Sequence, residues 1–437
     1  MSPTAKPTIE LDGSTLEGGG QLLRNAVALS ALTHTPVRVP NVRQGRDQPG
    51  LKAQHAAGLA LTAQISNART EGIEKGSQCV SFDPSEGYIR AGEYEADPGT
   101  AGSTMLLLQV SLPCLLFPER ADGPPAEQSS SSLPNEERAE NSSEQAASEG
   151  SEAIETIETG VDAENMPALH STLTLRGGTN ALNAPQADYA QHVLFPFLNT
   201  HVLPSSSSSS SNSTQHHEAL LRMDIKKRGF YPHGGGHLRV SIPALPKGQT
   251  LRAVTLTDRG EVVNVKGIVI VSGVIGLRVA SEMRQNALTE LHALSPELSS
   301  LPKTQVDIEI ESNPRGRAGS SIILLAYTST GCVLAGSALG SRGVRAAQTG
   351  KEAARELVRQ LQEGGCVDEW LQDQMIVFLA LAKGRSVVRT GRVTLHTRTA
   401  IWVAERLTGA KFEFKENVDG TEHSLIICEG IGLEGRL

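Results

Sequence analysis

The apolar and polar positions of the chain follow two alternating periods, one typical of strands and the other of helices. Strand-like runs occur at residues 8–13 (TIELDG) and 36–42 (PVRVPNV), and the second alternates apolar with polar side chains. Residues 19–34 and 50–66 instead space their apolar side chains as a helix would. Similar signals recur to the end of the chain, and together they predict an α/β or α+β fold.

Three segments near the C-terminus carry clear structural signals. Residues 349–364 have a helical pattern that ends at two consecutive glycines, which suit a helix C-cap. Residues 369–382 have an apolar helical pattern. In residues 391–407, a short strand-like run is followed by a helical pattern, and this arrangement places His396 at a strand-to-helix junction.

Two pairs of segments resemble each other. The Ala-Gly-Ser opening of residues 101–117 is repeated in residues 318–331. Residues 16–24 and 231–240 share a triple glycine followed by a polar residue and leucine. Because such self-similarity is typical of duplicated structural units, we expect several similar β-α-β-α-β-β units.

The length of 437 residues allows two domains, or one large domain with an insertion. We expect residues 1–258 and 366–437 to form a large domain of repeated units, with a smaller α/β domain inserted at 259–365. Residues 118–166 and 204–217 are polar, low in complexity and poor in aromatic side chains, so we predict two disordered insertions there. We interpret both as spacers, and a phosphorylation or partner-docking tract is the alternative.

The net charge of −8 is unevenly distributed along the chain. The first insertion alone contains thirteen Asp or Glu residues and two Arg residues. Removing its balance of −11 from the total of −8 leaves +3 for the remainder. A mildly basic folded part is compatible with a nucleotide or nucleic-acid ligand, although it does not require one.

The five cysteines are scattered and have no Cys-x-x-Cys spacing. They argue against a disulfide framework or a zinc site and favour a reducing compartment. The first residues contain no apolar signal segment, and the longest apolar runs are too short to span a bilayer. We therefore expect neither a signal peptide nor a membrane partner.

Two loops in the first sixty residues are candidates to bind an anion. Residues 18–20 are glycines that run into a predicted helix, where backbone N–H groups and the helix dipole favour a phosphate. A tight turn that needs small residues explains them equally well. Arg43 and Arg46 lie between a strand and a helix, a favoured place for anion sites in α/β folds. The plainer alternative for this pair is a solvated surface.

Three residues near the C-terminus have several possible roles. Trp370 could stack on a base or pack in the core. Asp373 could hydrogen-bond a ribose, bind a metal, orient an imidazole, or only stabilise the start of its helix. His396 could be a packed core residue, a proton shuttle or a covalent nucleophile. Each is explained by a structural role when taken alone, so only their combination favours catalysis.

Seven segments, in this order, resemble the RNA 3′-terminal phosphate cyclase family. They fall between residues 9 and 415 and are LDGSTLEGGGQLLRNAVALS, VRQGRDQPGLKAQH, AGSTMLLLQVSLP, GGTNALNAPQADY, RGFYPHGGGHLRV, DEWLQDQMIVFLALA and TLHTRTAIWVAERLTGAKFEF. Blocks of this length in this order are not explained by chance. The resemblance implies a large domain of repeated β-α-β-α-β-β units with a smaller α/β domain inserted late.

The resemblance also implies a reaction in three steps. ATP adenylates a histidine, AMP moves to an RNA 3′-phosphate, and the neighbouring 2′-hydroxyl closes a 2′,3′-cyclic phosphate. His396 matches the family's nucleophile. The positions that match the adenylate site are Gln109, Pro185, Trp370, Asp373 and Gln374. The positions expected to bind phosphate or the RNA end are Arg24, Arg43, Arg46 and Gln54. Glu17 is the candidate ligand for Mg²⁺ or Mn²⁺.

The chain departs from the family pattern at three positions. Trp370 stands where many relatives have Tyr, so stacking should persist while a hydroxyl contact would be lost. Leu16 replaces a glycine of bacterial members beside Glu17, and Ala400 replaces an asparagine.

The expected partners are ATP and an RNA that ends in a 3′-phosphate. Because aromatic residues make up only 3% of the chain, recognition should centre on the RNA end, with weak sequence preference. Some relatives are non-catalytic ribosome-assembly factors that lack the histidine, and the intact HTRTA sequence around His396 favours the enzyme. Enolpyruvate transfer by a distant fold relative would need a different set of lysines and arginines. We expect a nuclear location, with the cytoplasm as the alternative.

Overall fold

The computed structural model describes residues 6–119, 170–204, 220–416 and 423–437. Most of the two predicted insertions, 118–166 and 204–217, therefore lies outside the described residues. Among the helices that are described, none combines the length and apolar character that crossing a lipid bilayer requires.

The first structural unit has the element order β-α-β-α-β-β. Its elements are β1 (Ile9–Glu10), α1 (Gly20–Thr33), β2 (Val37–Val39), α2 (Ala53–Ser66), β3 (Arg69–Glu71) and β4 (Val80–Asp83). The sheet has the order β1-β2-β4-β3, with β1 parallel to β2 and the other neighbours antiparallel. Both helices end at a residue in the left-handed conformation, which is a common helix stop.

The second unit repeats this topology. Its elements are β5 (Glu93–Ala96), α3 (Thr104–Leu115), β6 (His170–Gly177), α4 (Ala187–Tyr189), α5 (Phe195–Phe197), β7 (Arg222–Lys227) and β8 (Gly236–Pro243). Wider π-helical turns at Ala190–Leu194 and Leu198–Val202 join α4 and α5 into one helical segment. The sheet order is β5-β6-β8-β7, again with the first two strands parallel.

The third unit has the same arrangement. Its elements are β9 (Thr255–Leu256), α9 (Glu369–Leu381), β14 (Lys383–Thr390), α10 (Leu395–Thr408), β15 (Lys411–Lys415) and β16 (Ser424–Ile431). The sheet order is β15-β16-β14-β9, with β9 parallel to β14. In each unit, the last strand lies between the second and the third. This repetition confirms the predicted α/β fold of β-α-β-α-β-β units.

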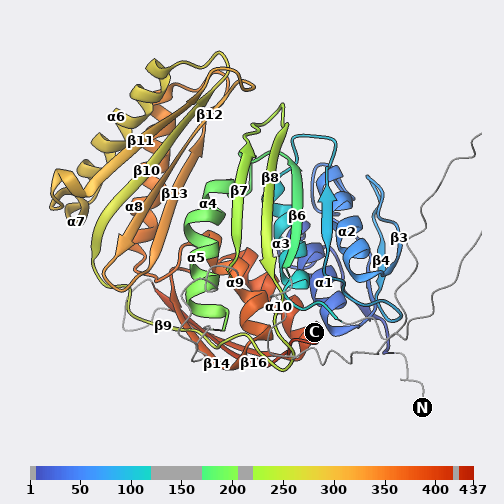
Figure 1. Cartoon of the computed structure of the whole chain (residues 1–437). Coiled ribbons are helices and arrows are strands. Elements are labelled where there is room, and N and C mark those ends of the chain that lie inside the picture. The colour runs from blue at the N-terminus through green and yellow to red at the C-terminus, as the bar shows by residue number, and fades with distance from the viewer. Residues whose placement is uncertain (1–5, 120–169, 205–219, 417–422) are drawn as a thin grey trace, which may run out of the picture.

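Between β9 and α9, the chain forms a separate sheet. Its elements are β10 (Val262–Ser272), α6 (Leu277–Leu294), α7 (Pro296–Ser299), β11 (Val306–Asn313), β12 (Gly319–Thr328), β13 (Val333–Leu339) and α8 (Ala346–Gln362). The sheet order is β11-β10-β12-β13, and α6 and α8 pack against it and each other. Figure 1 shows this inserted part, in yellow and orange, beside the three units. The domain boundaries at 259 and 365 stay a prediction.

The two pairs of similar segments found in the sequence do not occupy equivalent positions in these units. The Ala-Gly-Ser run before Thr104 opens helix α3, whereas the run before Ser321 opens strand β12. Likewise, the first triple glycine leads into helix α1 and the second into strand β8. A short apolar run is compatible with a buried helix or a buried strand, and β12 is a strand because β10 and β13 pair with it on both sides.

The helices of the three units pack against one another between the sheets (Figure 1). α1 contacts α3 and α10, and α9 contacts α3 and α10. Their fully buried side chains include Leu22, Leu107, Ile376 and Ala400. Ala400 therefore lies in an apolar contact between helices. All five cysteines are free thiols.

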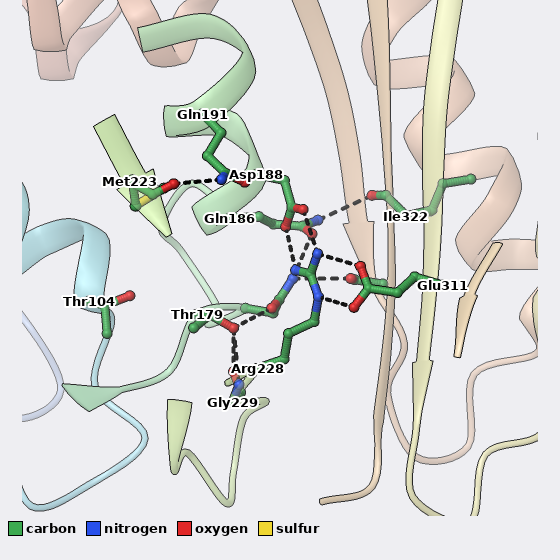
Figure 2. A network of polar contacts seen from close by, with 12 residues as sticks. Thr104, Thr179, Gln186, Asp188, Gln191, Met223, Arg228, Gly229, Glu311 and Ile322 are labelled. Carbon is green, nitrogen blue, oxygen red and sulfur yellow. Dashed lines mark hydrogen bonds and ion pairs between the residues drawn. The ribbon is translucent and has the colours of Figure 1, made fainter. Parts of the chain in front are cut away.

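Arg228 joins the inserted part to the second unit (Figure 2). Its Nη1 and Nη2 each donate to the Asp188 carboxylate at 2.8 Å, and its Nε and Nη2 donate to Glu311 of β11 at 2.7 Å. Nearby, Gln186 Nε2 donates to the carbonyl of Ile322 in β12 at 3.1 Å. The Asp188 side chain is 1% exposed and that of Arg228 is 10% exposed. The buried carboxylate therefore depends on Arg228 for charge compensation.

Candidate active site

A cavity of about 530 Å³ lies where helices of all three units meet. The first turns of α1, α2, α9 and α10 all reach its wall, through Gly20, His55, Trp370 and His396. Helix N-termini carry unpaired N–H groups and a partial positive charge, and both favour anions. The packing of the repeated units therefore brings four helix N-termini to one cavity, and their backbone groups alone favour the binding of a phosphate.

Ten of the eleven residues predicted for the site line this cavity. They are Glu17, Arg24, Arg43, Arg46, Gln54, Gln109, Pro185, Trp370, Asp373 and His396. Gln374 is the exception, because its Nε2 donates to the carbonyl of Trp370 at 2.6 Å. Its side chain lines a neighbouring pocket of about 20 Å³, together with Gln109 and Asp373.

His396 occupies the first turn of α10, and the prediction that it ends a strand is wrong. Thr394 caps this helix by accepting a hydrogen bond from the N–H of Thr397 at 3.1 Å. The alternation of apolar and polar residues before His396 resembles a strand with one buried face. Leu395, however, is 50% exposed and is the first residue of helix α10. The His396 side chain is exposed and lines the cavity, so it is not a packed core residue.

A buried glutamine of α9 fixes the start of α10. The side-chain carbonyl of Gln372 accepts hydrogen bonds from the N–H of Thr394 at 2.9 Å and the hydroxyl of Thr397 at 2.6 Å. Its Nε2 donates to the carbonyl of Arg392 at 3.1 Å. Gln372 is only 1% exposed, so these bonds form in a low-dielectric interior and hold the loop rigidly. The position of His396 thus follows from its packing on α9.

A hydrogen-bonded chain leads from Asp373 through Gln21 to His396. Gln21 Nε2 donates to Asp373 Oδ2 at 2.6 Å, and Gln21 Oε1 lies 2.7 Å from Nδ1 of His396. A carboxylate needs a donor, so it fixes the orientation of the Gln21 amide and leaves the amide carbonyl facing the ring. Nδ1 of a neutral His396 then carries the proton, and Nε2 keeps a free electron pair. A nucleophilic imidazole needs this arrangement.

Asp373 has an unusual environment for a carboxyl group. Burial raises its pKa to about 7, while the charge of Arg24 and the hydrogen bond from Gln21 act in the opposite direction. Its Oδ1 is shielded from solvent and has no hydrogen-bond partner among the described residues. Because buried polar atoms are normally paired, this oxygen beside the cavity is a candidate acceptor for a ligand hydroxyl.

Arg24 and His55 provide a charged and a neutral donor side by side. Arg24 Nε donates to Gln109 Oε1 at 3.1 Å, and burial lowers the pKa of Arg24 to about 10, so it stays charged at neutral pH. Burial, followed by the charges of Arg24, Arg43 and Lys52, lowers the pKa of His55 to about 3. Nδ1 of His55 accepts from the N–H of Lys52 at 3.2 Å. Nε2 of the neutral ring therefore carries the proton and can donate to an anion.

The two arginines of the loop after β2 have different roles. Arg43 is buried, and its Nη1 donates to the carbonyls of Gln48 and Gly50 at 2.7 and 2.8 Å, so it holds its own loop together. Arg46 forms an ion pair with the Glu17 carboxylate and donates to the Glu17 carbonyl at 2.9 Å. Neither guanidinium is therefore an isolated, solvated side chain.

The triple glycine is required by local packing. Gly18 has a φ of +58°, in the left-handed region that favours glycine. A Cβ atom on Gly20 would lie 2.3 Å from Nε2 of His55, which is too close for any real contact. The tight-turn interpretation is therefore confirmed. Gly19 and Gly20 also line the cavity, and their role as an anion site stays a prediction.

Trp370 and Pro185 offer an apolar surface on the cavity wall. Trp370 Nε1 donates to Glu356 Oε1 at 3.0 Å, and Oε2 of the same carboxylate accepts from the N–H of Ser337 at 2.7 Å. Glu356 belongs to α8 and Ser337 to β13, so the inserted part anchors the indole. A partly buried indole on the wall of a cavity is suited to stacking with a flat ring.

Several lining residues gave no signal in the sequence, among them Gln21, Asn183 and Thr394. A glutamine inside a helix or a threonine before one suggests no particular chemistry. Gln21 is buried, and its contacts with Asp373 and His396 in three dimensions are what distinguish it from other glutamines.

Known proteins resemble this chain over almost its whole length. A family model described as RNA 3′-terminal phosphate cyclase matches residues 15–122 and 165–414, which include every residue lining the cavity. A Dictyostelium discoideum protein named "Probable RNA 3′-terminal phosphate cyclase" is 35% identical over 436 residues, covering 98% of this chain and 83% of that protein.

Two further relatives carry the name "RNA 3′-terminal phosphate cyclase". The Drosophila melanogaster protein is 33% identical over 436 residues, covering 99% of both chains. The Methanopyrus kandleri protein is 34% identical over 414 residues, covering 93% of this chain and 95% of its own.

Proposed function

Because the chain belongs to the RNA 3′-terminal phosphate cyclase family, we propose that it uses ATP to convert an RNA 3′-phosphate into a 2′,3′-cyclic phosphate. The proposed route passes through a covalent histidine-AMP intermediate and an RNA adenylate. The observation that carries the proposal is the position of His396. Its Nδ1 is engaged by Gln21, and its side chain lines a cavity that also holds Arg24, Arg46 and Lys52.

Each step of this route exchanges one bond to phosphorus for another. First, Nε2 of His396 attacks the α-phosphorus of ATP, a P–N bond forms, and pyrophosphate leaves. Second, an oxygen of the RNA 3′-phosphate attacks the same phosphorus, and the imidazole regains its electron pair as the P–N bond breaks. Third, the vicinal 2′-hydroxyl attacks the terminal phosphorus, loses its proton, and AMP leaves. Direct ring closure would have to expel oxide or hydroxide, so adenylation supplies the leaving group, and the tethered hydroxyl gains effective concentration.

The cations of the cavity would stabilise the charge that moves in these steps. Phosphoryl transfer depends mainly on positioning and charge neutralisation. Arg24 is partly buried and charged, and neutral His55 can donate from Nε2 beside it. The stacking surface of Trp370 and Pro185 would hold the adenine, and Oδ1 of Asp373 would accept a hydrogen bond from the ribose.

Glu17 is the residue best suited to hold a divalent cation, Mg²⁺ or Mn²⁺. Its Oε2 is buried without a partner among the described residues, while Oε1 is paired with Arg46. Magnesium usually takes one or two protein carboxylates and completes its shell with phosphate oxygens and water. A single available carboxylate oxygen fits this requirement, even though the described residues contain no cluster of three ligands. When bound, the ion would neutralise charge on the pyrophosphate.

The proposed function is tested with a 5′-labelled RNA that ends in a 3′-phosphate. Incubation with ATP and Mg²⁺ should make the terminal phosphate resistant to phosphatase, and omitting ATP should prevent this. An RNA whose last nucleotide is 2′-deoxy cannot close the ring and should accumulate as the adenylate. A non-catalytic role in pre-rRNA processing predicts RNA binding without any ATP-dependent change, and that outcome with folded protein would contradict the proposal.

The chain from Asp373 to His396 predicts a pH effect on adenylation. Because burial raises the pKa of Asp373 to about 7, its ionised fraction falls as the pH drops through 7. The ionised form fixes the Gln21 amide, so the adenylation rate should fall in the same range. Asp373→Asn should reduce the rate by about 10- to 100-fold, the usual effect of removing a residue that orients a functional histidine. The residual rate should lack the pH dependence that Asp373 contributes.

Asp83→Asn is a matched control for this variant. Asp83 ends β4, where its carboxylate pairs with Arg69 at 3.1 Å on the protein surface. The same change of carboxylate to amide there should leave the adenylation rate and its pH profile unchanged. An Asp373→Asn enzyme with the wild-type pH profile would exclude the positioning role.

A further inference from the structure

A second cavity, of about 380 Å³, lies outside the candidate active site. The charged and titratable side chains on its wall are Asp97, Arg176, Lys227, His233, His237 and Arg317. Three of these are permanently positive at neutral pH and one is acidic, so the wall carries net positive charge. We refer to it as the basic cavity.

Separate parts of the fold contribute to the basic cavity. Arg176 comes from β6, Lys227 from the end of β7, and Arg317 from the loop between β11 and β12 of the inserted part. The pairing of β7 with β8 has an irregularity between Ile225 and Lys227, and such bulges redirect side chains. Lys227 consequently lines the basic cavity, while the next residue, Arg228, forms the internal network of Figure 2.

Two of these cations are available to an anionic ligand. Lys227 is exposed, and neither it nor Arg317 forms an ion pair with an acidic side chain in the described part of the chain. Arg317 Nη1 donates to the carbonyl of His233 at 2.5 Å, which holds the guanidinium at the wall. Arg176, in contrast, is paired with Glu95. Lys227 and Arg317 are therefore the charges that a ligand would neutralise.

One short segment connects the basic cavity with the candidate active site. Thr100 lines the basic cavity. Three residues later, the N–H of Ser103 donates to Gln54 Oε1 at 3.1 Å, and Gln54 lines the active-site cavity. An extended chain of three residues spans at most about 11 Å. A polymer whose end occupies the active-site cavity would therefore reach the basic cavity within a few monomers.

We propose that the basic cavity binds the phosphodiester backbone of the substrate RNA, upstream of the end that reacts. This inference rests on the proposed function, because it requires the RNA 3′-phosphate to occupy the active-site cavity. Lysine and arginine side chains that contact phosphates supply affinity that depends on salt and not on sequence. The site should therefore accept any RNA that is long enough to reach it.

The test compares two double variants that each remove two positive charges. Lys227→Gln with Arg317→Gln changes the basic cavity. Lys226→Gln with Arg315→Gln is the matched control, because these exposed residues lie beside the first pair and do not line the cavity. Fluorescence anisotropy at several salt concentrations gives the Kd of each protein for a ten-nucleotide RNA with a 3′-phosphate.

The cavity variant should bind the ten-nucleotide RNA about 10-fold more weakly than the control. The slope of log K against log salt should fall by about 1.4, the value for two lost contacts to a single strand. A 3′-phosphorylated dinucleotide has only one phosphodiester, directly beside the reacting nucleotide, so its Kd should not change. Self-adenylation with ATP alone should also be unchanged.

Equal affinities of the two double variants for the ten-nucleotide RNA would overturn the inference. An equal loss of affinity for the dinucleotide and the longer RNA would also overturn it, since the effect would then not depend on the length of the RNA. Failure of the proposed function is a different result, in which the wild-type protein forms neither an adenylate nor a cyclic phosphate. The binding measurement decides the inference without requiring either product.

Discussion

Replacing His396 with asparagine should abolish the transfer of AMP to the protein while leaving the fold intact. After exposure to ATP and Mg²⁺, the wild-type protein should gain the mass of one AMP, and His396→Asn should gain none. An asparagine amide can still donate a hydrogen bond to Gln21 Oε1, but its nitrogen has no free electron pair to attack phosphorus. We expect the adenylation rate to fall by at least about 1000-fold, as for other nucleophile replacements.

His292→Asn is the control for this experiment. His292 is an exposed residue in the last turn of α6, far along the chain from the site, and its replacement should leave the AMP gain unchanged. Both variants should keep the wild-type unfolding midpoint, because His396 is exposed and its side chain supports no core packing. AMP found on another side chain by peptide mapping would refute the mechanism. Loss of folding in His396→Asn would instead support a structural role.

Arg228→Met should cause the largest loss of stability among single substitutions outside the apolar core. It leaves the Asp188 carboxylate, 1% exposed, without its bidentate partner. Breaking a buried ion pair by removing one member typically destabilises a protein by about 3–5 kcal/mol. The pair with Glu311 should add little, because that side chain is 45% exposed. Urea unfolding followed by circular dichroism measures the effect as a lower midpoint of the first transition.

Arg239→Met is the matched surface control. Arg239 lies on β8, and its nearest acidic partner, Glu93, is 3.9 Å away with both side chains mostly exposed. Its loss should change the free energy of unfolding by less than about 1 kcal/mol. Adding Asp188→Leu to Arg228→Met should restore part of the stability, because no buried charge then remains unpaired. Equal midpoints for Arg228→Met and Arg239→Met would contradict this account.

The sequence was sufficient to predict the fold class because the strand and helix periods are local properties. The helices predicted at 349–364 and 369–382 occur at Ala346–Gln362 and Glu369–Leu381. The first also ends as expected, since Gly364 follows it with a φ of +71°. The repeated topology was predicted as well, although the two pairs of similar segments that suggested it occupy unrelated positions in the fold. A short apolar run does not show by itself whether it forms a strand or a helix, because the elements that pack or pair with it decide this.

The candidate site was predicted less completely, because its key contacts are long-range. The strand-like run at residues 391–395 is not a strand: β14 ends at Thr390, and Thr394 and Gln372 organise the start of α10, which the apolar pattern does not encode. Gln21 was missed for the same reason. The use of ATP, the divalent cation and the nuclear location stay predictions.

The hydrogen bond between Gln21 and His396 joins residues 375 positions apart, and this has a consequence for biosynthesis. Ribosomes add about 5–20 residues per second, so roughly 20–80 s separate the emergence of the first partner from that of the second. A nascent chain that stops before α10 contains the sheets of the first two units and of the inserted part but lacks His396, the proposed acceptor of AMP. On the proposed mechanism, reaction with ATP would therefore mark polypeptides whose translation has passed through α10.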